Sequence, residues 1–132
     1  MTISKIRKKM HQYTICDGKM IGDFESLYKN FKDPFIQTKK EKFETSKKAI
    51  INYCQLLQSK KKGVLKTLEI GCGFGQLSKE LKKLKFNAHG TDISETAIKK
   101  AQKRSLVKFY TSEFLNFKFY KKSILMSLFY QR

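Results

Sequence analysis

Residues 67–77 read TLEIGCGFGQL, a short apolar run followed by glycines at positions 71, 73 and 75. The run predicts a strand over residues 64–70 that passes through a glycine turn into a helix over residues 76–83, where leucines recur at helical spacing. Glycines at alternate positions let the backbone turn tightly and approach a ligand without obstruction by a Cβ atom. The N–H groups at the start of the following helix can then hold an anion such as a carboxylate.

The same rhythm of short strands and helices continues after the turn. We predict strands over residues 87–91, 107–110 and 123–129, and a helix over residues 94–103 with Ser94 as its N-cap. Strands that alternate with helices predict right-handed crossovers and a parallel α/β sheet. Upstream, helical spacing predicts helices over residues 23–31, capped by Asp23, and 41–59. We therefore expect one domain, with an N-terminal helical segment over residues 1–62 and a Rossmann-like portion over residues 63–132.

Two acidic residues flank the predicted ligand edge of this sheet. Glu69 lies two residues before Gly71, and Asp92 follows the second strand, 21 residues after Gly71. Ligands of open parallel sheets bind at the carboxyl ends of the strands, where Asp92 is placed to accept hydrogen bonds from ribose hydroxyls. A carboxylate before the first glycine suits a ligand with a cationic end. It suits the pyrophosphate of a dinucleotide poorly, and the third glycine also comes one residue too early for the dinucleotide fingerprint. A phosphate-binding P-loop is excluded because no Gly-Lys-Ser/Thr follows.

The combination Glu69-x-Gly71-x-Gly73-x-Gly75 followed by Asp92-Ile93-Ser94 resembles motifs I and II of the class I S-adenosylmethionine-dependent methyltransferases, over about residues 64–115. The resemblance implies S-adenosyl-L-methionine as cofactor. In that family the glycine loop lies against the methionine part, the acid matching Asp92 binds the ribose, and the apolar residue after it packs on adenine. The resemblance thus implies cofactor contacts from Glu69, Gly71, Cys72, Gly73, Gly75, Asp92, Ile93, Glu113 and Phe114. Glu113 stands where the family more often has Asp, and Phe114 supplies a backbone N–H.

A weaker likeness covers residues 20–35, from MIGDFE to Asp33-Pro34-Phe35. This stretch is similar to the N-terminal part of bacterial small-molecule and sugar-modifying methyltransferases, including nodulation-type N-methyltransferases. In those enzymes an aromatic residue after Asp-Pro, often Trp, lies in a segment that covers the cofactor, and Phe35 matches it in position but not in type. A helix packed on the sheet is the other interpretation, and both stay open. The likeness implies a small-molecule or sugar-type methyl acceptor.

The family's fold has about seven strands, whereas this sequence predicts about four preceded by N-terminal helices. The resemblance therefore implies an incomplete, C-terminally truncated methyltransferase fold, in which the fourth strand pairs beside the first. Such a chain is an inactive or partial fragment, or a partner chain completes the sheet. No general base or other catalytic residue can be named from the sequence.

Charge leaves a second class of function open. The chain has 29 Lys and Arg against 11 Asp and Glu, a formal net charge of +18, and only Arg7, Arg104 and Arg132 are arginines. Arg rather than Lys is the usual residue for bidentate phosphate contacts, so the lysines favour a compositional bias over a dedicated nucleic-acid surface. Non-specific attraction to nucleic acid is expected either way. The alternatives are an RNA methyltransferase and a non-catalytic basic module that binds polyanions.

Other classes of protein are disfavoured. The sequence has no apolar run of the ~18 residues that a membrane span needs, and its basic N-terminus lacks the apolar region of a secretory signal. Cys16, Cys54 and Cys72 have neither disulfide-framework nor metal-ligand spacing, so we expect a cytoplasmic protein without a metal site. We expect Cys72 to be a small turn residue rather than a nucleophile, and His89 to pack within its strand rather than act as a base.

Overall fold

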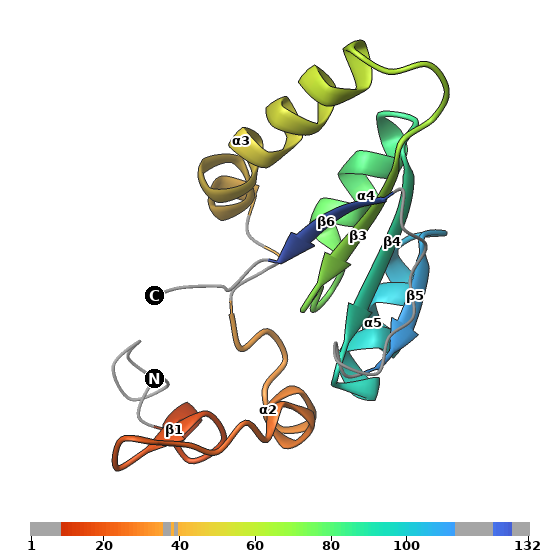
Figure 1. Cartoon of the computed structure of the whole chain (residues 1–132). Coiled ribbons are helices and arrows are strands. Elements are labelled where there is room, and N and C mark those ends of the chain that lie inside the picture. Colours follow the sequence, from red (N-terminus) through yellow and green to blue (C-terminus); the bar gives the residue numbers. More distant parts are fainter. Residues whose placement is uncertain (1–8, 36–37, 39, 113–122, 128–132) are drawn as a thin grey trace.

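A four-stranded parallel sheet forms the centre of the computed structural model, which describes residues 9–35, 38, 40–112 and 123–127. Its strands are β3 (Lys66–Ile70), β4 (Asn87–Asp92), β5 (Lys108–Thr111) and β6 (Ser123–Ser127). They lie in the order β5-β4-β3-β6, and every neighbouring pair is parallel (Figure 1). The predicted Rossmann-like order, with the fourth strand beside the first, is confirmed.

Two helices make the crossovers between these strands. Helix α4 (Gln76–Lys83) has the predicted bounds, and α5 (Glu95–Arg104) begins at the predicted cap, where the Ser94 hydroxyl accepts the N–H of Ala97 at 3.1 Å. Both lie behind the sheet in the view of Figure 1. They share one buried core with α3 (Lys40–Ser59) and the sheet, which includes Cys54, Leu77, Leu81, Ala88, Ile98, Ala101 and Phe109. The three helices therefore cover the same face of the sheet.

The N-terminal part holds a small hairpin as well as helices. Strands β1 (Ile15–Cys16) and β2 (Lys19–Met20) pair antiparallel across Asp17 and Gly18, which have φ values of 49° and 74°. Two central residues with positive φ are typical of a type I′ hairpin turn, and Asp-Gly is a preferred sequence for it. The segment expected to be helical is thus partly a β-hairpin, and α2 (Phe24–Asn30) follows it in Figure 1.

Helix α2 (Phe24–Asn30) begins where the sequence predicts. The Asp23 carboxylate accepts the Ser26 N–H at 3.1 Å, so the N-cap expected at this residue is confirmed. Leu27 and Tyr28 are its buried residues. Tyr28 lies in a cluster with Ala97 of α5, so α2 packs beside the helix that follows Asp92.

Phe109 of β5 determines how closely the glycine turn approaches the sheet. Its ring lies over the backbone of Gly75, the N-cap residue of α4, and 2.8 Å separate its Cδ1 from the place where a Cβ on Gly90 would stand. Gly75 also has a φ of +72°, which side chains rarely adopt. A methyl group at Gly75 would therefore meet both backbone strain and the Phe109 ring.

We predict that Gly75→Ala lowers the free energy of unfolding by about 2–4 kcal/mol, from left-handed strain and overpacking together. Gly63→Ala is the matched control, because Gly63 has a φ of +84° but nothing within 4 Å of its Cβ position. Strain alone predicts a loss of about 1 kcal/mol there. Urea unfolding of the two variants measures the difference, and equal losses would contradict the packing role of Phe109.

Candidate functional site

The glycine turn and the end of β4 meet at the carboxyl edge of the sheet. Gly71, Gly73 and Gly75 all have positive φ, and the Gly75 N–H donates to the Cys72 carbonyl at 2.8 Å. The Cys72 N–H donates to the carbonyl of Thr91 at 3.0 Å, which ties the turn to β4. The structure thus brings the predicted glycines beside the residue that the sequence singles out next, Asp92.

The Asp92 carboxylate bridges two backbone segments. Its Oδ2 accepts the N–H of Gly73 and its Oδ1 accepts the N–H of Ser94, both at 2.9 Å. The side chain is buried at 7% exposure, and this burial raises the pKa of Asp92 above its usual value although both N–H groups act to lower it. A carboxylate offers about four acceptor sites, so the two amides leave capacity for a further donor.

An exposed apolar side chain and an open stretch of backbone lie beside this buried acid. Ile93 is 48% exposed, and Gly71 is exposed at the end of β3. A buried acceptor next to an apolar surface suits a nucleoside, which has ribose hydroxyls to donate and a flat base to pack. The residues present therefore fit the nucleoside half of S-adenosylmethionine, and their assignment to it stays a prediction.

Glu69 lies deeper than the sequence suggests. Only 1% of it is exposed, and its Oε2 accepts the N–H and the hydroxyl of Ser78, on α4, at 3.1 and 2.6 Å. Burial raises the pKa of Glu69, while the charge of Lys47 and the bonds from Ser78 act to lower it. The positive charge that acts on Glu69 is thus that of Lys47, and the carboxylate is bonded to α4, the helix that follows the glycine turn.

Lys47 is a residue that the sequence reasoning missed. It is 8% exposed, on α3. The signal that could have found it is its spacing, because positions 47, 50, 54 and 57 share one face of a helix and the other three are apolar. Its charge acts to lower the pKa of Glu69, so the two side chains interact, although burial of Glu69 has the larger effect.

Cys72 and His89 lie in buried surroundings that suit packing rather than catalysis. Burial raises the pKa of the Cys72 thiol well above its ordinary value, which disfavours a thiolate nucleophile. His89 is buried at the middle of β4, with Nδ1 3.1 Å from the Tyr110 hydroxyl and Nε2 3.1 Å from Asn87 Oδ1. Burial together with nearby lysines lowers its pKa, so it packs as a neutral ring.

The N-terminal segment reaches the glycine turn through an aromatic cluster. Phe74 of the turn packs against Tyr28 of α2 with ring centroids 5.5 Å apart, and Phe35 packs edge-on against the same Tyr28 at 5.9 Å. Lys100 of α5 donates to the Tyr28 carbonyl at 3.1 Å, and its ammonium lies 5.4 Å from the Phe74 ring centroid. Phe35 therefore belongs to the cluster that joins α2 to the turn and to α5.

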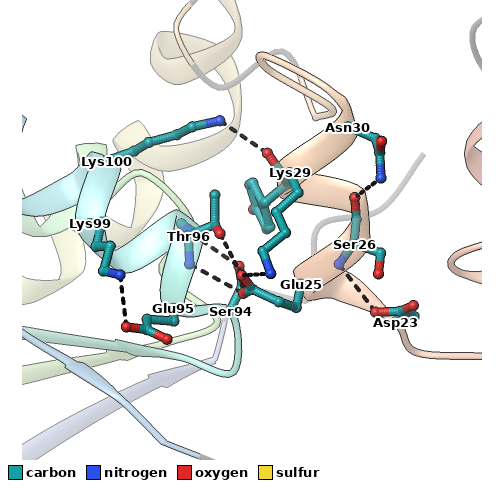
Figure 2. Close-up of polar contacts among 12 residues, drawn as sticks. Asp23, Glu25, Ser26, Lys29, Asn30, Ser94, Glu95, Thr96, Lys99 and Lys100 are labelled. Carbon is teal, nitrogen blue, oxygen red and sulfur yellow. Dashed lines mark hydrogen bonds and ion pairs between the residues drawn. The ribbon is translucent and has the colours of Figure 1, made fainter.

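Figure 2 shows a second link between α2 and α5, which the sequence reasoning also missed. The Glu25 carboxylate accepts the Ser94 hydroxyl at 2.7 Å, the Thr96 N–H at 3.2 Å and the Thr96 hydroxyl, and Lys29 lies 3.6 Å away. Burial acts to raise the pKa of Glu25, but the bonds from Thr96 and Ser94 outweigh it and hold the pKa at about 2. Sequence offers no local signal for this contact, because about 70 residues separate its partners.

Glu113 and Phe114, expected to contact adenine, lie outside the described residues. Ser112, the residue before them, lies beside the end of β4, because its N–H donates to the Asp92 carbonyl at 3.0 Å. The chain therefore leaves β5 beside the predicted ribose acid.

Residues 60–131 match the family described as a methyltransferase domain, which is more than half of the chain. The chain belongs to the class I S-adenosylmethionine-dependent methyltransferase family. None of the curated proteins has a significant sequence match to it.

Solved structures agree with this family membership. The plantazolicin methyltransferase BpumL, crystallised with a pentazolic desmethylPZN analog and SAH, is 25% identical with a TM-score of 0.55, over 91% of this chain and 46% of that one. The PH0226 protein from Pyrococcus horikoshii OT3 is 25% identical with a TM-score of 0.50, over 73% and 46%. Magnesium protoporphyrin IX methyltransferase (ChlM) from Synechocystis PCC 6803 with bound SAH, at 17% identity and a TM-score of 0.54 over 86% and 54%, shows the fold alone. The chain spans about half the length of these structures.

The described part of the chain has neither a membrane-spanning helix nor a cluster of metal-binding side chains. None of its helices has the length and apolar character to cross a membrane. Its His, Cys, Asp and Glu side chains include no group of three or more that could bind a metal ion.

We predict that Glu69→Gln stabilises the fold at pH 7. The amide oxygen still accepts from Ser78, while the desolvation of a charge is removed. The folded-state pKa of Glu69 is raised above 4.5, so the stability contributed by its protonated form is full below pH 4.5 and is lost as pH rises through the folded pKa. Urea unfolding should show wild type and variant converging below pH 4.5 and diverging above it.

Glu80→Gln is the control for this experiment, because Glu80 makes a half-exposed ion pair with Lys83 at 2.9 Å. We expect no comparable gain there as pH rises. A Glu69→Gln variant less stable than wild type at pH 7 would mean that the attraction of Lys47 outweighs burial.

Proposed function

We propose that this chain binds S-adenosylmethionine at the carboxyl edge of its sheet and forms the cofactor half of a methyltransferase. The observation that carries the proposal is the buried Asp92 carboxylate, which keeps acceptor capacity beside the exposed side chain of Ile93. Asp92 accepts from the ribose hydroxyls, and Ile93 packs on adenine. The glycine turn, from Gly71 through Cys72 and Gly73 to Gly75, lies against the methionine part.

Three further residues complete the proposed cofactor site. Glu69 supports the turn from behind and supplies negative charge toward the cationic end of the ligand. Glu113 and the backbone N–H of Phe114 contact adenine, in line with the position of Ser112 beside Asp92. When bound, S-adenosylmethionine would supply a methyl group that an acceptor nucleophile attacks in line, so that the sulfur–methyl bond breaks and S-adenosylhomocysteine leaves. The chain's contribution to that reaction is to bind and orient the donor.

We propose a small-molecule or sugar-type acceptor, with RNA as the alternative. BpumL, a methyltransferase named for plantazolicin, supports the first choice by its similarity. So does the placement of charge. Lys66, Lys82 and Lys108 surround His89 closely enough to lower its pKa, and they lie at the beginnings of β3 and β5 and the end of α4, away from Asp92. A polyanion held by these lysines would lie at the opposite end of the sheet from the methyl donor.

Titration calorimetry with S-adenosylhomocysteine tests the cofactor site. We predict that the wild-type chain binds it and that Asp92→Ala weakens the affinity about 10- to 100-fold, as expected for loss of hydrogen bonds to a charged acceptor. Glu95→Ala is the control, because this substitution removes the same charge nearby from a side chain that is 63% exposed and pairs with Lys99. Circular dichroism melts show whether each variant is folded.

Three other outcomes would redirect the assignment. A folded wild-type chain that does not bind S-adenosylhomocysteine contradicts the proposal. Binding of NADH instead would indicate a dinucleotide site. Nucleic-acid binding that falls steeply with salt, without any cofactor binding, would favour the basic polyanion-binding module.

A further inference from the structure

Glu25 reaches the start of α5 from a helix about 70 residues away in sequence. Its carboxylate accepts from the Ser94 hydroxyl, the Thr96 N–H and the Thr96 hydroxyl (Figure 2). A carboxylate at a helix N-terminus is also favoured by the helix dipole. These are more numerous and more directional contacts than the exposed pairs on the same surface, such as Glu95 with Lys99.

Ser94 connects Glu25 to the predicted ribose acid. Its N–H donates to Asp92 Oδ1 at 2.9 Å, its hydroxyl donates to Glu25 Oε2 at 2.7 Å, and the same hydroxyl accepts the Ala97 N–H at 3.1 Å. The N–H and the hydroxyl of Ser94 are therefore both engaged, in three hydrogen bonds. One of the N–H groups that orient Asp92 thus belongs to a residue that is itself hydrogen-bonded to Glu25.

The electrostatics are consistent with this connection. The negative charge of Glu25 acts to raise the pKa of Asp92, so the two carboxylates are close enough to interact. Two acids that repel each other are held at one helix start by separate N–H donors, Ser94 for Asp92 and Thr96 for Glu25.

We propose that Glu25 is a positioning residue for Asp92, acting through Ser94 to hold the carboxylate where it accepts from the ribose hydroxyls of the cofactor. The inference rests on the proposed function, since it takes Asp92 as the ribose acceptor. It makes the N-terminal helix α2 part of the cofactor site without requiring that Glu25 touch the ligand.

The test compares adenosine with 2′,3′-dideoxyadenosine, both measured by competition with S-adenosylhomocysteine. Wild type should prefer adenosine, because only adenosine has the hydroxyls that Asp92 accepts. Glu25→Ala should reduce this preference about tenfold, the equivalent of one well-placed hydrogen bond. The preference of Glu25→Gln should fall between those of wild type and Glu25→Ala, because the amide keeps one acceptor oxygen. Glu95→Ala should match wild type.

A merely structural role for Glu25 predicts a different result. Loosening of the fold would weaken both nucleosides equally and leave their ratio unchanged in Glu25→Ala, which would overturn the inference. Glu25→Gln keeps the test decisive if the alanine variant does not fold. If wild type shows no preference for adenosine and Asp92→Ala has no effect on S-adenosylhomocysteine, the proposed function itself fails, and this inference fails with it.

A double-mutant cycle locates the path of the effect. Ser94→Ala removes the hydroxyl but keeps the N–H that donates to Asp92. If Glu25 acts through Ser94, adding Glu25→Ala to Ser94→Ala should change the adenosine preference much less than Glu25→Ala does alone. Fully additive effects would exclude Ser94 as the intermediary.

Discussion

The Asp92 carboxylate accepts one N–H from the glycine turn and one from Ser94, the N-cap residue of α5, and this bridge fixes the edge of the sheet where the site lies. The turn after β3 and the turn after β4 are separate in sequence, and parallel pairing alone brings only their strands together. The shared carboxylate sets how the two turns face each other. Since the group is buried, it tolerates little displacement without losing a partner.

The N-terminal segment attaches to this bridge at two points of different character. Phe74 packs against Tyr28 in an apolar contact that any α2 of the right shape could make, and Glu25 adds directional bonds to Ser94 and Thr96. Apolar packing is tolerant of small shifts, whereas hydrogen bonds to a charged group define a geometry. The two together place α2 against both turns that flank Asp92.

The sequence was sufficient for those parts of the fold that depend on neighbouring residues. The bounds of α4, the caps at Asp23 and Ser94 and the strand order all follow from spacing, capping and crossover rules. The hairpin at Asp17-Gly18 has a local signal too, but its strands have two residues each, too few to show an alternating pattern.

The candidate site was less predictable because its contacts are distant in sequence. The sequence places Glu69 and Asp92 at the ends of their strands, but it does not show that Glu69 turns toward Ser78 and away from solvent. Nor does it pair Glu25 with Ser94, since side-chain direction and helix docking decide that contact. Local pattern thus identified the acids, and tertiary packing determined which of them remains available to a ligand.

The placement of acids in so basic a chain is itself informative. Only 11 acidic residues oppose 29 basic ones, yet the charge of Asp92 acts to raise the pKa of Glu69, and the charge of Glu25 acts to raise the pKa of Asp92. Such a cluster is unfavourable to folding by itself and is stabilised by N–H groups at the starts of α4 and α5. Two lysines also take part, because the charge of Lys47 acts to lower the pKa of Glu69 and the charge of Lys29 acts to lower the pKa of Glu25. Part of the basic excess of the chain therefore favours the ionised form of acids at this edge of the sheet, where charges within about 8 Å are screened least by salt.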